Sequence, residues 1–96
     1  MLKLFILNNG REVIGKLIKS TDTSFVVNSP RILHFSPTQT GDAYGIELYP
    51  YSMTNPDGDH RFHMITIASE SLNIPDDVEK GYIQQTSGIS IVSSLK

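Results

Sequence analysis

The chain has 96 residues, with 8 Lys and Arg against 10 Asp and Glu, and therefore a formal net charge of -2. This length fits one domain over residues 1–96, and the charge excludes a strongly basic nucleic-acid binder, so we expect no DNA partner. Cysteine is absent, which excludes disulfides and thiolate-bound metals and leaves oligomerisation as the common way to support so small a core.

The first third of the chain is typical of a β-meander. Residues 2–8 and 11–20 are strand-like runs joined by Asn9-Gly10, the strongest short hairpin signal. We expect a type I′ turn there, because both turn residues tolerate a positive φ. Gly15 lies inside the second run and predicts a bulge or a strong bend, as a barrel requires where a strand curves.

A third strand is predicted at 24–28, after a polar turn at 21–23, and it resumes at 31–35. Pro30 lacks a backbone donor and therefore marks an edge, a bulge or a break. Residues 36–42 have the composition of a loop.

Two later runs, 43–53 and 60–68, alternate in hydrophobicity on either side of a tight turn at 55–59. We expect these two runs to pair with each other as a hairpin. Residues 71–74 predict a very short strand that Pro75 ends.

Residues 77–86 predict a short helix, and Asp76 and Glu79 before and within it have the spacing of a capping box. Its apolar side would carry Val78, Tyr82 and Ile83. Residues 89–95 have strand propensity and few charges, so an exposed edge there would favour pairing with another chain.

One segment carries a family pattern. Gly10-x-x-Val13-x-Gly15-x-Leu17, preceded by an apolar strand and followed by an acidic turn, resembles the first motif of the Sm-like (LSm) family. The resemblance covers residues 4–28 well and residues 60–75 poorly.

The resemblance implies a mainly β fold, a small and strongly bent five-stranded Sm-like barrel over about 2–75. Residues 35–58 would form an enlarged loop or hairpin between strands 3 and 4. The helix and tail at 76–96 would follow the barrel.

The second motif of the family is weaker and allows two registers. In the preferred register Ala68 and Ser69 replace the family's arginine and glycine, which leaves a short last strand before Pro75. In the other register, residues 63–67 match the His-containing motif of the bacterial chaperone Hfq, but the accompanying tyrosine and lysine are missing.

The resemblance implies a homo-oligomeric ring, in which the fourth strand of one subunit pairs with the fifth strand of the next. It also implies that single-stranded RNA binds at the loops after strands 2 and 4. The corresponding positions are Thr21, Asp22, Phe25, Ala68 and Ser69. Phe25 replaces the asparagine that usually contacts a base; it would stack on a base, although a place in the core is the simpler interpretation.

The alternative hypothesis is a structural or protein-binding ring that has lost its RNA pocket. The acidic balance favours it, because RNA affinity depends largely on Lys and Arg at phosphates. Lys16, Lys19, Arg31 and Arg61 would supply a local basic patch or only scattered surface charge. Residues 35–58, with Tyr44, Tyr49 and Tyr51, would then form a partner surface or simply cover the barrel.

No catalytic motif is present, so we expect neither enzymatic activity nor a cofactor. Gly-x-Ser-x-Gly and the phosphate-cradling glycine patterns are absent. His60 and His63 lie close to Asp57 and Asp59, but residues 60 and 63 of one strand face opposite sides, so no metal site is expected.

No run approaches the ~20 apolar residues of a membrane helix. The apolar start of the chain also lacks the pattern of a secretory signal. We therefore expect a soluble, cytoplasmic protein with no membrane partner.

Overall fold

The computed structural model of the protein describes residues 1–37 and 44–87. Within these residues it has six strands and one α-helix, so the predicted mainly β fold with a helix after the strands is confirmed. The elements are β1 (Leu2–Leu7), β2 (Glu12–Ser20), β3 (Ser24–Pro37), β4 (Tyr44–Pro50), β5 (Asp59–His63), the 3₁₀ helix η1 (Met64–Thr66), β6 (Ile67–Ser71) and α1 (Asp76–Thr86).

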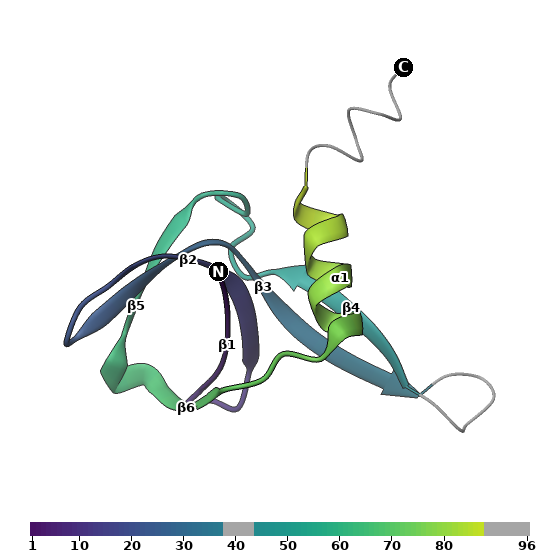
Figure 1. The fold of residues 1–96 in the computed structure, drawn as a ribbon, viewed down its shortest axis with the longest axis horizontal. Coiled ribbons are helices and arrows are strands. Elements are labelled where there is room, and N and C mark those ends of the chain that lie inside the picture. The colour runs from purple at the N-terminus through teal and green to yellow at the C-terminus, as the bar shows by residue number, and fades with distance from the viewer. Residues whose placement is uncertain (38–43, 88–96) are drawn as a thin grey trace, which may run out of the picture.

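The strands form one antiparallel sheet with the order β4-β3-β2-β1-β6, and β5 pairs with β3 beside this path. The sheet is strongly curved, and α1 lies beside the ribbon formed by β3 and β4 (Figure 1). Only the three residues of η1 separate β5 from β6, although these strands pair with different neighbours.

The predicted hairpin of β1 and β2 is confirmed, but its turn is not type I′. Leu7 N donates to Arg11 O and Gly10 N donates to Leu7 O, both at 2.8 Å, so the loop consists of Asn8, Asn9 and Gly10. In this loop only Gly10 has a positive φ, 89°. A three-residue loop of this kind combines a type I turn with one left-handed glycine.

The bend predicted at Gly15 is confirmed, and the extra residue lies on β3. The pairing shifts so that Gly15 opposes both Ser29 and Pro30, and Ser29 has a φ of 52°. A Cβ at residue 15 would lie 1.9 Å from Cγ1 of Val27, so only glycine permits this approach of the two strands.

β3 passes through Pro30 without a break, so of the three possibilities predicted for Pro30 the bulge is observed, and the strand does not stop and resume. β2 lies along one edge of β3, while the other edge is shared: residues 24–28 pair with β5 and residues 31–37 pair with β4. Pro30 stands where one neighbour replaces the other, so its missing N–H removes no ladder hydrogen bond. Residues 36 and 37 belong to β3, and residues 38–42 lie outside the described residues.

The predicted hairpin of 43–53 with 60–68 is also wrong, because β4 and β5 each pair with β3. β3 is long enough to pair with the two strands one after the other along the same edge, and the sequence alternation does not encode this. The turn at 55–59 is confirmed by the hydrogen bond from Gly58 N to Asn55 O, at 3.5 Å.

The run 60–68 is two strands rather than one. β5 ends at His63, η1 follows as a single turn, and β6 pairs with β1. The last strand is therefore 67–71, in place of the predicted 71–74, and Ile74 packs against the core beyond the strand end.

The core consists of two clusters. The first contains Phe5, Leu7, Val13, Phe25, Val27 and Phe62, with Leu17 packed against it. The second contains Leu4, Ile14, Leu33, Val78 and Tyr82, which bring α1 onto the sheet. Adjacent residues of β2, Val13 and Ile14, therefore serve opposite sides, as the loose alternation of that strand predicts.

The predicted helix is confirmed as α1, with Val78 and Tyr82 buried, but Ile83 is 48% exposed. The capping box does not form. Pro75 is the N-cap, its carbonyl accepts from Glu79 N at 3.0 Å, and Asp76 already lies inside the helix.

The strand predicted at 89–95 lies outside the described residues. In the part of the chain that the structure describes, no helix has the length and apolar character needed to cross a membrane.

Candidate functional site

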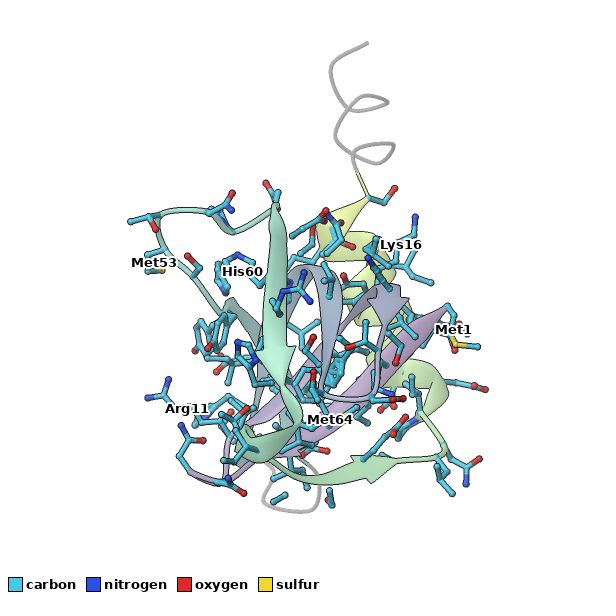
Figure 2. The ribbon with its side chains drawn as sticks, turned by 90° about the vertical axis from the view of Figure 1, so that its left-hand side faces the viewer. Met1, Arg11, Lys16, Met53, His60 and Met64 are labelled. Carbon is cyan, nitrogen blue, oxygen red and sulfur yellow. The ribbon has the colours of Figure 1, made fainter. Side chains whose placement is uncertain are left out.

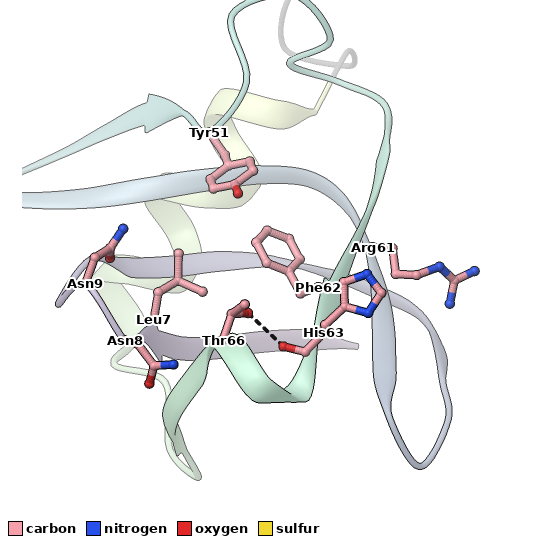
Figure 3. Close-up of a pocket in the computed structure, with 8 residues that line it drawn as sticks. All are labelled: Leu7, Asn8, Asn9, Tyr51, Arg61, Phe62, His63 and Thr66. Carbon is pink, nitrogen blue, oxygen red and sulfur yellow. Dashed lines mark hydrogen bonds between the residues drawn. The ribbon is translucent and has the colours of Figure 1, made fainter.

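A cleft of about 420 Å³ opens between the β1–β2 turn, the end of β5 and η1. Its lining residues are Leu7, Asn8, Asn9, Tyr51, Arg61, Phe62, His63 and Thr66 (Figure 3). Leu7 and Phe62 belong to the first core cluster, so the floor of the cleft is apolar. The other six side chains give it a polar and aromatic rim.

Hydrogen bonds between the β1–β2 turn and η1 fix one side of this rim. Asn8 N donates to Thr66 O at 2.8 Å, and Asn8 Nδ2 donates to Ile65 O at 2.7 Å. Thr66 Oγ1 in turn donates to His63 O at 2.7 Å, which closes the single turn of η1 (Figure 3). This side of the rim is thus held by hydrogen bonds between two segments that are far apart in the sequence.

Tyr51 forms the aromatic wall of the cleft. Its ring centroid lies 4.9 Å from that of Phe62 and 5.8 Å from that of His60. These contacts hold the ring against the core, yet the residue remains 39% exposed. A partly exposed, packed aromatic ring suits stacking with a planar ligand.

Arg61 places a cation at the outer edge of the cleft. It alternates with Phe62 along β5 and is therefore exposed, and its Nη1 donates to Ser24 Oγ at 2.8 Å. Figure 3 shows its guanidinium beyond the outer side of β5, with the His63 ring on the same side of the strand and both pointing away from Phe62. Among the described residues, the ion pairs are Lys3–Glu70 and Arg31–Asp57, so the charge of Arg61 is not neutralised by a carboxylate.

The residues predicted at the RNA positions occupy three environments. Thr21 and Asp22 are exposed in the turn between β2 and β3, whereas Phe25 is only 1% exposed. Phe25 packs against the rings of Phe5 and Phe62, so it lies in the core and offers no face for a base.

Ala68 and Ser69 are exposed on β6, where Ser69 stands opposite Ile6 of β1. The segment that reaches the β2–β3 turn is η1 instead, because Met64 N donates to Thr23 O at 2.8 Å. The connection between β5 and β6 is therefore 64–66.

Several lining residues were not predicted from the sequence. Asn8, Asn9 and Thr66 carried no signal beyond turn composition, and Tyr51 was only one of three tyrosines in a long insertion. The alternative register, which begins at His63, was the sequence feature that pointed to this region.

The predicted basic patch is divided by burial. Arg31 is 5% exposed and tied to Asp57, whereas Lys16, Lys19 and Arg61 are exposed. Only the exposed members can meet a ligand directly.

Among the described residues, no three His, Asp or Glu side chains are grouped as metal ligands. The Nε2 atom of His60 lies 2.8 Å from Asn55 O, and Asp59 Oδ1 accepts from Asn28 Nδ2 at 2.9 Å. These polar groups hold the turn at 55–59 together.

No protein-family model matches the chain, and no curated protein matches its sequence. The chemistry of the cleft consists of one aromatic wall and the amides of Asn8 and Asn9, with the guanidinium of Arg61 at its outer edge. These groups can stack on a planar ring, attract an anion and hydrogen-bond a polar edge.

Proposed function

We propose that the protein is an Sm-like subunit that assembles into a homo-oligomeric ring and binds single-stranded RNA through the cleft. The observation that carries the proposal is that β5 pairs with β3 and β6 pairs with β1, so each has an edge without a partner strand in the described part of the chain. Within the described residues each pairs with one strand only, and the two are joined through η1.

The strand path supports a small closed barrel. β6, β1, β2, β3 and β5 follow one another as neighbours, and η1 joins the two ends of that series covalently. Gly15 and the bulge at Ser29 supply the curvature that closure needs (Figure 1). β4 and the second half of β3 would then be the extended hairpin.

Ring assembly would pair the free edge of β5 with the free edge of β6 in the next subunit. Unpaired strand edges are templates for another chain, and repeating one rotation closes a ring without leaving edges. Two exposed apolar side chains flank β6, namely Ile65 at 84% and Leu72 at 89%. Burying them between subunits would add hydrophobic stabilisation.

In the proposed complex a base stacks on Tyr51, while Arg61 on the outer side of β5 attracts a phosphate at the edge of the cleft. Base–aromatic stacking contributes about 1–3 kcal/mol per base and tolerates every base. The net charge of -2 keeps the phosphate contribution small, so affinity would depend strongly on stacking.

The ring is tested by measuring the mass of the native assembly. We expect one sharp oligomer, and a monomer at all concentrations would contradict the ring.

RNA binding is tested by filter binding of oligo(U) and oligo(A) across a salt series. We expect Tyr51→Ala to weaken binding roughly 5- to 150-fold, the equivalent of losing one stacked base. Tyr49→Ala is the matched control, because Tyr49 is 49% exposed on β4 and does not line the cleft. Absence of binding at low salt would contradict the RNA function.

A second candidate function is a ring that binds protein instead of RNA. It is favoured by the β3–β4 ribbon, where Phe35 and Tyr49 are each 49% exposed, and by the exposed Met53 of the following loop (Figure 2). A sharp oligomer that binds neither oligonucleotide at low salt would favour this function over the first.

A further inference from the structure

We infer that Arg31 is a positioning residue for the cleft, because it holds the loop 51–58 that carries Tyr51. This inference rests on the proposed RNA site for its functional meaning. Arg31 itself lies on β3 and does not line the cleft.

The Arg31 side chain is 6% exposed, and its guanidinium donates in three directions. Nη1 donates to Pro56 O at 2.6 Å and Nη2 donates to Asp57 Oδ1 at 2.8 Å, so two atoms of the loop are held at its far end. Nε donates to Gln85 Oε1 at 2.8 Å, which connects the same guanidinium to α1.

The near end of the loop is fixed at the same place. Pro30 O accepts from Tyr51 N at 3.0 Å and from Arg31 Nη1 at 3.3 Å, so one carbonyl connects the two residues. Ser29 N also donates to Gly58 O at 2.9 Å. Both ends of the loop therefore meet at the bulge of β3, and the Tyr51 ring leaves this anchored backbone toward the cleft.

Arginine is required here for its shape more than for its charge. Asp57 has a side chain that is 76% exposed, so water weakens this ion pair. The rigid planar fork of arginine reaches a carbonyl, a carboxylate and an amide oxygen at once, which a lysine ammonium on a flexible stem does not. Removal of the fork would also leave Pro56 O without this buried donor.

Helix α1 takes part through Gln85. Its Nε2 donates to Leu48 O at 2.9 Å while its Oε1 accepts from Arg31, so one side chain joins β4 to the guanidinium. The wall of the cleft is in this way anchored to the helix on the other side of the ribbon.

The first test does not depend on RNA. Proton NMR measures the contacts between the rings of Tyr51 and Phe62, whose centroids are 4.9 Å apart in the native structure. We expect these ring contacts to be lost in Arg31→Lys and weakened in Asp57→Ala. Glu70→Ala is the matched control, because it breaks the Lys3–Glu70 ion pair on β1 and β6 and should leave the contacts unchanged.

The second test is a double-mutant cycle on oligo(U) affinity. We expect Arg31→Lys to weaken binding roughly 5- to 50-fold, within the coupling range of residues that share partners. The same substitution in a Tyr51→Ala background should change affinity by less than about twofold, because the ring that Arg31 positions is gone.

Equal effects of Arg31→Lys in both backgrounds, or unchanged ring contacts, would overturn the inference. If Arg31→Lys does not fold, Asp57→Ala replaces it in both tests, since its side chain is exposed and lies outside the core. If the native protein binds no oligonucleotide, the proposed function fails, while the ring contacts still decide whether Arg31 positions Tyr51.

Discussion

The Val27 side chain, in the first core cluster, fills the space that a side chain at residue 15 would need. A Cβ at residue 15 would lie 1.9 Å from Val27 Cγ1 and 3.3 Å from Asn28 O. Val27 is fully buried, so its methyl group has no free space to move into. The curvature of the sheet at this point thus depends on the absence of a single methyl group.

We therefore expect Gly15→Ala to destabilise the fold by ~1–3 kcal/mol, as overpacked cores do. For a chain of this size that corresponds to a fall in Tm of roughly 5–20 °C. Thermal unfolding followed by circular dichroism measures it. Gly45→Ala is the control, because the nearest atoms to its Cβ would be 3.8 Å away, and a similar fall in both variants would contradict the explanation.

The hydroxyl of Tyr82 makes stability depend on pH. It donates to Asn28 O at 2.9 Å and to Ser29 O at 3.0 Å, at the bulge of β3. Burial raises the pKa of Tyr82 above its usual value. Because the unfolded chain then loses this proton first, the contribution is complete below pH ~10 and is lost as pH rises through the higher pKa of the folded state.

The Tyr82→Phe variant should lose about 1–3 kcal/mol at neutral pH, since the two carbonyls that share the hydroxyl proton lose this donor. It should also lose less stability than the native protein between neutral and strongly alkaline pH. Urea unfolding at several pH values measures both effects. Parallel alkaline curves for the two proteins would show that another group titrates.

At the scale of elements, β3 explains which sequence predictions succeeded. The β1–β2 hairpin and α1 depend on residues close in the chain, namely a turn glycine and the apolar spacing of Val78 and Tyr82, and both were predictable. The pairing of β4 and β5 was not, because each strand depends on a distant half of β3. Pro30 predicts an edge, a bulge or a break, and the sequence does not decide among them, because the missing donor matters only where a neighbouring strand needs one.

At the scale of the whole molecule, the cleft was also hard to predict, because it depends on contacts between distant parts of the chain. Its lining comes from the β1–β2 turn, the loop 51–58, β5 and η1, which are brought together by long-range pairing. The predicted site residues Ala68 and Ser69 lie on β6 and do not line the cleft, because the sequence pattern placed the connection before the last strand a few residues too late. The unrecognised signal was the 3₁₀ turn at 64–66, which ends one strand and begins another.

The central place of β3 also determines how the backbone exchanges hydrogen with solvent. Residues 25–28 and 31–33 have a paired strand on each side, whereas β4, β5 and β6 each have one neighbour in the described part of the chain. We expect the β3 amides to exchange more slowly with deuterium than those of β4, measured by NMR. Equal rates in β3 and β4 would contradict this order.

Assembly would change this pattern selectively. If β5 and β6 pair between subunits, dilution to monomers should speed exchange in these two strands and leave β4 unaffected. During synthesis, β3 emerges before both strands that cover its second edge, so the nascent chain exposes that edge until residue 63 has followed. The strand that organises the finished molecule is thus also the segment most open to mispairing while the chain is incomplete.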